Sequence, residues 1–407
     1  MKLLIFKSCR CVVLLSALVI TGGAQAAFTN DLPTLVADVL ANDPAILEAK
    51  ANEELAATQT EATRAQRLPT LGVSAAEALV DRDERDTPFR GVVGRINLYS
   101  SGMIGAQIER DEFRQAQQHF KTEETREYIA YTMTSDYLEA LRATELLNAE
   151  RANLGRHQRI VSDLEIVVNH DGGRRHELVQ ARSRALQVEL RMVQYQKAIG
   201  VALSRLTRFT DREPSLQDPV PESWREILPA SVLTLPHPSV QAQKQEAASL
   251  GAEQRSLERS LRPRVDLEAG AGNDEYAQVQ LRWDFFDRPA RFNSAAAGKQ
   301  LAAARLRADQ IERTVNQQAA TAETEIEQSL RQIRASSEQI RSSAEVAELY
   351  QLQFKVGRRS LLDLVNAYAE LASVEIARIN AVNDHRQAVV NLLYARAALA
   401  DWLLARR

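Results

Sequence analysis

One stretch of this sequence occurs twice, and this repetition constrains the fold more than any other feature. Residues 354–367 read Phe-Lys-Val-Gly-Arg-Arg-Ser-Leu-Leu-Asp-Leu-Val-Asn-Ala and lie between two long helical patterns. Gly357 can adopt the left-handed conformation that ends a helix. Ser360 is a suitable N-cap, and Asp363 stands at the capping-box position. Alone, the pattern predicts a tight reversal between two helices, which could be an ordinary hairpin turn.

A degenerate second copy lies earlier in the chain. Residues 177–190 align with residues 363–376 at an offset of 186, and a Gly-Gly turn at 169–175 precedes them. Two dipeptides repeat at an offset of 194, namely Asp43-Pro44 with His237-Pro238 and Leu68-Pro69 with Arg262-Pro263. The chain is therefore predicted to be a tandem duplication. A unit of about 190 residues is too long for a solenoid repeat and indicates two halves of one domain.

Residues 1–26 are predicted to be a secretory signal peptide. An apolar run at 11–20 precedes a small-x-small cleavage site at 24–26. The run is shorter than a membrane-spanning helix requires, although an uncleaved anchor is an alternative. Both cysteines, Cys9 and Cys11, fall within this segment. We therefore expect no thiol, no disulfide, no Cys-ligated metal and no lipid anchor in the mature chain.

The composition of the mature chain favours long helices and gives no sign of an enzyme. Removing the three basic residues of the signal from 51 leaves 48 against 54 acidic residues, a net charge of −6, which does not suggest nucleic-acid binding. Gly and Pro together number 28 of 407 residues, and aromatics are 5%. The histidines include no metal-ligand spacing, and no nucleophile elbow, phosphate loop or paired-carboxylate site is present. We expect no catalytic residue, metal or cofactor.

Both halves are predicted to follow one plan of helix, strand hairpin, long helix, tip turn and helix. In the first repeat (27–209), the hairpin covers 69–100 and the tip turn 169–175. A linker with five prolines (210–236) leads to the second repeat (237–407), with its hairpin at 263–287 and its tip turn at 356–360. The long helices lack internal proline and would each extend about 100 Å. A coiled-coil seam runs along residues 326–347, which a plain helical bundle would also explain.

Several element ends are predicted more closely. The first helical segment is expected over 31–67, with Pro44 as its early breaker and Asn42 or Asp43 as a cap. The last strand is expected to end at Phe285-Phe286. The last helix is expected to run from Ser360 to Leu404.

The strands alternate between apolar and polar residues, most clearly over 277–285. About ten residues suffice for a tilted strand to cross a bilayer. Four strands cannot close a barrel, and their two open edges would be very costly in lipid. Two interpretations follow. Either several subunits share a barrel, for which three copies would give twelve strands, or a small soluble sheet caps a helical bundle.

Strand hairpins set between long helices, in two tandem halves, resemble the TolC family of outer-membrane efflux channels. The resemblance covers residues 31–402. Its most specific parts are residues 354–367, the hairpin starts at Leu68-Pro69 and Arg262-Pro263, and the turn at 285–291. It implies a mainly α fold with a small β part. Three copies would form a twelve-stranded β-barrel in the outer membrane of a Gram-negative bacterium and a helical tunnel through the periplasm.

The resemblance also implies partners and residue roles. The homotrimer would be a passive exit channel of a tripartite efflux or type I secretion system, in contact with outer-membrane lipid, a periplasmic adaptor and an inner-membrane transporter. Adaptor contacts at the tip would be Gly172, Gly173, Arg174, Gly357, Arg358, Arg359 and Ser360. A latch that closes the tip would be formed by Glu177, Phe354 and Arg359. Asp363 and Asn366 would line the periplasmic entrance, and Arg95, Arg282 and Asp284 the barrel lumen.

The roles and the family pattern leave alternatives open. Arg359 can be a solvated turn residue, and Asp363 and Glu177 can be helix-capping acids. Asn366 replaces a second acid of the best-known member, the first tip lacks the usual Val-Gly arrangement, and the short segment after the last helix predicts a reduced belt around the tunnel. The alternative function is a periplasmic coiled-coil structural or adaptor protein outside the membrane. Two hairpins with strands at the opposite ends of the helices argue against it.

Overall fold

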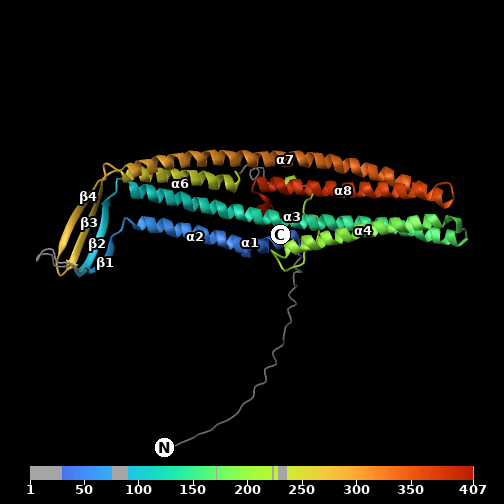
Figure 1. Cartoon of the computed structure of the whole chain (residues 1–407), viewed down its shortest axis with the longest axis horizontal. Helices are drawn as coiled ribbons and strands as arrows, with labels where there is room; N and C mark the ends of the chain where they lie inside the picture. Colours follow the sequence, from blue (N-terminus) through green and yellow to red (C-terminus); the bar gives the residue numbers. More distant parts are fainter. Residues whose placement is uncertain (1–29, 76–89, 171, 222–223, 228–235, 407) are drawn as a thin grey trace, which may run out of the picture.

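The computed structural model describes residues 30–75, 90–170, 172–221, 224–227 and 236–406, and the predicted signal peptide lies outside these ranges. The chain forms a long layer of helices with a small sheet at one end and two helix reversals at the other (Figure 1). Two helices of 68 residues, α3 (Met103–His170) and α7 (Arg288–Lys355), run between the two ends. Among the described helices, none combines the length and apolar character needed to cross a membrane.

The other helices lie end to end beside the two long ones (Figure 1). They are α1 (Leu32–Asn42), α2 (Pro44–Ala65), α4 (Arg175–Leu206), α6 (Pro238–Ser260) and α8 (Leu361–Ala395), with a short α5 (Trp224–Ile227) in the linker. Near the sheet the packing order is α2, α3, α6, α7, and near the reversals it is α4, α3, α8, α7. Thus α2 and α4 form one lateral edge of the layer, and α7 forms the other.

The first helical segment is interrupted at one of its two predicted caps. The side chain of Asp43 accepts a hydrogen bond from the N–H of Ala45 at 2.8 Å, and Pro44 is the first residue of α2. Proline lacks an N–H group and is therefore tolerated at this position. The result is two helices, α1 and α2, in place of one continuous segment.

The prediction of an unbroken last helix over 360–404 is wrong. Helix α8 ends at Ala395, Ala397 has a φ of +50°, and a short helix α9 (Leu399–Leu404) follows. The carboxylate of Glu127 on α3 accepts the N–H groups of Leu399 (3.1 Å) and Ala400 (3.3 Å). A side chain distant in sequence thus accepts the hydrogen bonds of the first N–H groups of α9. The local sequence around α9 cannot reveal such a contact.

The four strands form one antiparallel sheet in chain order: β1 (Thr70–Ala75), β2 (Arg90–Tyr99), β3 (Arg264–Gly272) and β4 (Tyr276–Arg282). Pairing of β2 with β3 joins the two halves of the chain.

The expectation that β4 continues to Phe285 is wrong. The indole of Trp283 donates to the carbonyl of Leu261 at 3.1 Å, so the residue after β4 is bonded to the end of α6.

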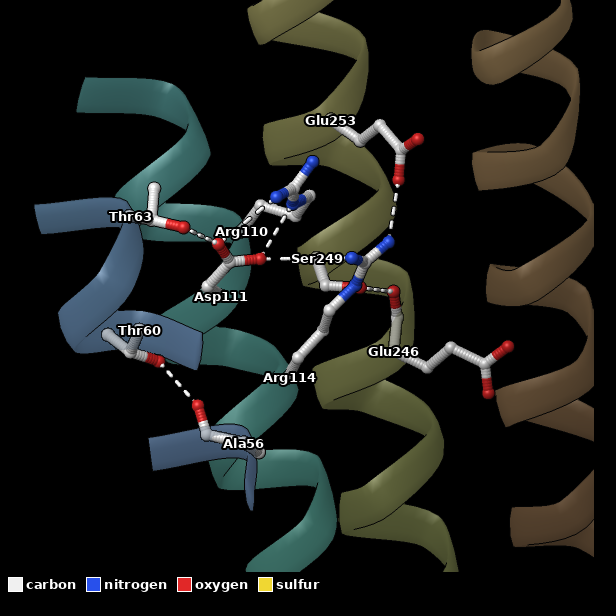
Figure 2. A network of polar contacts seen from close by, with 9 residues as sticks. All are labelled: Ala56, Thr60, Thr63, Arg110, Asp111, Arg114, Glu246, Ser249 and Glu253. Atoms are coloured by element: carbon white, nitrogen blue, oxygen red, sulfur yellow. Dashed lines mark hydrogen bonds and ion pairs between the residues drawn. The ribbon is translucent and has the colours of Figure 1, made fainter. Parts of the chain in front are cut away.

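Polar contacts tie the helices together near the sheet (Figure 2). Asp111 on α3 is buried and accepts hydrogen bonds from Thr63 on α2 (2.7 Å) and from the neighbouring Arg110 (2.7 Å). Burial alone would raise the pKa of Asp111, but these hydrogen bonds hold it below its usual value. Arg114, one turn on, donates to Glu253 of α6 at 2.9 Å. Charged side chains therefore fix how α2, α3 and α6 align.

Glu127, the buried acid that caps α9, should make the stability of the fold depend on pH. Glu127 is 5% exposed, and burial raises its pKa to about 7. The folded state therefore binds this proton more tightly than the unfolded chain does. The resulting stabilisation is fully present below the unfolded pKa and is lost as pH rises through about 7.

We expect Glu127→Gln to remove this pH dependence, because the neutral amide keeps an acceptor oxygen for α9. The variant should gain about 2–3 kcal/mol of stability relative to the native chain between pH 5 and pH 8. Thermal unfolding followed by circular dichroism across that range measures the difference. Parallel curves for the two proteins would show that Glu127 does not titrate there.

Candidate functional site

The register of the sheet separates its side chains into two faces of opposite character. One face is apolar from edge to edge except for Arg90, which lies opposite Ala75 at the end of the β1–β2 pair. Leu71 and Val73 of β1 lie on it and are 79% and 85% exposed. Its other members are Val92, Gly94, Ile96, Val265, Leu267, Ala269, Ala271, Ala277, Val279 and Leu281. An exposed apolar surface of this extent marks contact with lipid or with another protein.

The opposite face is polar and partly paired. Arg95 lies opposite Glu268, with 2.6 Å between guanidinium and carboxylate, and the amide of Asn97 donates to Asp266 at 2.8 Å. Arg282 shares this face, since it lies opposite Arg264. Asp284 lies two residues beyond the end of β4 and does not belong to the face. The sheet thus brings Arg95 and Arg282 to one face but leaves out Asp284.

Both outer strands of the sheet are edges. In the part of the chain that the structure describes, β1 pairs only with β2, and β4 pairs only with β3. Each edge therefore presents backbone N–H and C=O groups that lack a strand partner within one chain.

Exposed aromatic side chains gather where the sheet meets the helices. They are Tyr99, Trp283, Phe285, Phe286 and Phe292. The rings of Trp283 and Phe285 lie edge to face, with centroids 6.2 Å apart. Aromatic rings at such a boundary are typical of membrane interfaces. We assigned no role to these residues from the sequence, although the Trp-x-Phe-Phe run was a visible signal.

At the opposite end, the second reversal has the predicted turn geometry. Gly357 has a φ of +74°, and Arg358 donates its N–H to the carbonyl of Gln353 at 2.9 Å. Ser360 caps α8, since its hydroxyl accepts the N–H of Asp363 at 3.2 Å. The same hydroxyl donates to the carboxylate of Asp363 at 2.9 Å. Asp363 therefore holds the cap through the serine hydroxyl.

The first reversal contacts the second through Arg174. Residues Gly172–Arg174 form a single 3₁₀ turn before α4. The guanidinium of Arg174 lies 2.6 Å from the carboxylate of Glu177 and 5.8 Å from the ring centroid of Phe354 on α7. Phe354 is 8% exposed and packs in a cluster with Leu164, Leu178 and Leu364. Arg174 thus connects two predicted latch residues, a link that sequence spacing did not reveal.

Arg359 has its contacts within its own hairpin. Its guanidinium lies 4.2 Å from the ring centroid of Tyr350, donates to the side chain of Gln353 at 2.9 Å and lies 3.8 Å from Asp363. None of these contacts reaches Glu177, so pairing of Arg359 with Glu177 stays a prediction. Asn366 is exposed on α8, one turn beyond Asp363.

Within the described ranges, no group of three or more His, Cys, Asp or Glu residues is arranged to hold a metal ion. The site residues brought together by the fold are instead those of two surfaces, the sheet and the tip.

Comparison with known protein families gives one match, which covers part of the chain. Residues 232–397 match the family model described as outer membrane efflux protein. No curated protein sequence is significantly similar to the chain.

Solved structures share the fold over most of the chain. The MtrE outer membrane channel of Neisseria gonorrhoeae is 18% identical, with a TM-score of 0.77 over 91% of this chain and 90% of that one. VceC of Vibrio cholerae is 16% identical, with a TM-score of 0.77 over 90% and 96%. The CmeC outer membrane channel of Campylobacter jejuni is 14% identical, with a TM-score of 0.77 over 90% and 85%. These structural matches confirm the predicted fold class, and the family model supports the predicted family resemblance over residues 232–397.

The contacts of Arg174 generate a test of the tip. We expect Arg174→Ala to loosen both reversals, because it removes the Glu177 ion pair and the contact with Phe354. These half-buried interactions contribute about 1 kcal/mol together, so local opening should become about fivefold more frequent. Hydrogen–deuterium exchange of residues 172–180 and 353–361 measures the change. Arg175→Ala, at an exposed neighbour, is the matched control, and equal exchange in the two variants would contradict the role of Arg174.

Proposed function

We propose that this chain, which carries the outer membrane efflux protein domain and the fold of the outer-membrane channels, is the exit channel of an export system and acts as a homotrimer. The observation that carries the proposal is the sheet, with one apolar face, one polar face and two unpaired edges. An apolar face toward lipid and a polar face toward water is the arrangement of a transmembrane barrel wall. One chain supplies only a third of such a wall.

The number of copies follows from the strands. Lipid contains no water to satisfy edge N–H and C=O groups, so the edge of β1 must pair with β4 of another copy. Two copies would give eight strands, whose interior is filled by side chains, whereas three give twelve. Polar residues such as Arg95, Glu268 and Arg282 would then line the lumen.

The lateral edges of the helical layer support the same closure. Helix α4 exposes an apolar row at heptad spacing, formed by Val179, Leu186, Leu190 and Val193. Helix α7, at the other edge, exposes Val346, Leu349 and Leu352, and the exposed Val356 follows as its C-cap. Because the two rows lie at opposite edges of the layer, the α4 row of one copy would pack against the α7 row of a neighbouring copy. Such head-to-tail contacts produce a ring if the rotation closes.

The tip is proposed to be the periplasmic end. The exposed aromatic residues at the foot of the sheet would mark the inner boundary of the membrane, and the helices extend from there toward the reversals (Figure 1). We assign the reversals, with Gly172, Gly173, Arg174, Gly357, Arg358, Arg359 and Ser360, to contact with a periplasmic adaptor. An inner-membrane transporter would supply the energy, because a channel of this kind is a passive conduit.

A closed tip would limit conduction until a partner opens it. Arg174, Glu177 and Phe354 would hold the two hairpins together within each copy, and Arg359 is available for contacts between copies. Three copies of Asp363 would form an acidic ring that favours cations. Asn366 would add no charge to it.

The first test is the mass of the detergent-extracted protein, measured together with conductance in planar bilayers. We expect three chains per particle and a small conductance, which Arg174→Ala combined with Glu177→Ala should increase. A higher conductance would indicate that the helix reversals at the tip have separated. A water-soluble monomer or dimer without conductance would contradict the channel function.

A second test distinguishes a membrane barrel from a soluble sheet. Val279 and Gln280 are neighbours on β4 but lie on opposite faces. An arginine that faces lipid costs about 2–4 kcal/mol near the midplane, and it occurs three times per trimer. We expect Val279→Arg to abolish recovery in the outer-membrane fraction, and Gln280→Arg to be tolerated. Equal recovery of both variants would place the sheet in water.

A further inference from the structure

A pocket of about 530 Å³ lies between α3, α7 and α8, midway between the sheet and the tip. Helices α6 and α8 lie end to end between α3 and α7, and the layer changes from one to the other here (Figure 1). The rings of His237, next to the start of α6, and Tyr394, near the end of α8, lie edge to face with their centroids 5.4 Å apart. The pocket therefore lies at the junction of the two halves of the helical layer.

Three tyrosines form the aromatic part of the pocket wall. They are Tyr128 and Tyr131 on α3 and Tyr394 on α8. The rings of Tyr131 and Tyr394 are 4.6 Å apart, and the Tyr131 hydroxyl donates to Asn391 at 3.2 Å. Tyr128 is 55% exposed. Its ring is thus reachable from solvent, while the other two rings are held in place.

The charged side chain that lines this pocket is acidic, and further carboxylates lie nearby. Glu325 on α7 is the only charged residue among the described lining residues, and the rest are Thr, Gln, Asn, Ala and the tyrosines. The carboxylates of Glu124 and Glu127 lie close enough to Tyr394 to raise its pKa, after burial as the main cause, to about 12. Burial lowers the pKa of His237, so its imidazole adds no positive charge. The exposed Lys121 is the nearby cation that acts on Glu124.

Aromatic faces and carboxylates together select one kind of ligand. An aromatic ring attracts a cation through its quadrupole, most strongly where water is excluded. Organic cations with apolar groups also bury surface against such walls, and the volume is typical of small-molecule sites. The pocket near Glu145 and Asp218 differs, because Arg334, Arg378 and Arg386 line it.

We propose that the pocket between Tyr128, Tyr131, Tyr394 and Glu325 binds organic ammonium cations of aryl or alkyl type. The ring of Tyr128 covers the cation from solvent, and Glu325 supplies the charge. This inference does not rest on the proposed channel function, because a binding measurement requires only the folded protein.

The test uses the purified full-length protein and phenyltrimethylammonium as the probe. Equilibrium dialysis measures its Kd, and benzylsulfonate, an anion of similar size, shows whether charge is selected. We expect Tyr128→Leu and Glu325→Gln each to weaken cation binding about three- to tenfold, the range expected for cation–π and partly exposed charge interactions. Tyr128→Phe keeps the ring and should bind as the native protein does.

The matched charge control is Glu327→Gln. Glu327 lies two residues from Glu325, pairs with Arg331 at 3.5 Å and does not line the pocket. Its removal should leave the Kd unchanged. Because Tyr128, Glu325 and Glu327 are exposed, these variants should fold, which circular dichroism verifies. Equal affinity for cation and sulfonate, or equal loss with Glu327→Gln and Glu325→Gln, would overturn the proposal.

Discussion

The pairing of backbone groups at the two edges of the sheet is the constraint on which the rest of the structure depends. A sheet of four strands with an apolar face can be stable in lipid only if its edge N–H and C=O groups find partners. One chain cannot provide them, because β1 and β4 lie at opposite edges. Pairing of β2 with β3 places one edge in each half of the chain. The two halves of the chain thus supply two different edges, which suits head-to-tail closure of identical copies.

The helical layer combines an apolar core around α1, α3, α8 and α9 with small side chains and buried charges along the long helices. The buried residues of α7 are mostly Ala and Ser, which allows neighbouring helices to approach closely. Charged pairs set the alignment between helices. Glu150 of α3 is fully buried against Arg191 of α4 at 2.6 Å, and Arg386 of α8 binds Glu145 of α3 at 2.9 Å. Buried ion pairs contribute little net stability, because desolvation offsets their attraction. Their contribution here is to define one register between long helices that could otherwise slide.

The sequence predicted the elements well where a single period continues for many residues. The long stretches without internal proline predicted α3 and α7, and the heptad seam along α7 and the period of two in the strands reflect which side chains face the interior. Predictions failed at element ends. The break between α8 and α9 depends on Glu127, 272 residues away from Leu399. The end of β4 coincides with the bond from Trp283 to Leu261 of another element. Local patterns contain no information about such contacts.

The sequence by itself determined the succession of long helices and strand hairpins, the positions of the two reversals and the two-sided character of the strands. These follow from local rules: periodicity, a glycine with positive φ at 357, and an N-cap at Ser360. Only the tertiary structure decided which residues of the tip meet. It placed Arg174 between Glu177 and Phe354, held Arg359 on its own hairpin, and brought three tyrosines from α3 and α8 to one pocket. The physical reason is that these contacts join helices distant in sequence, whose relative rotation and register are set by packing of the whole layer.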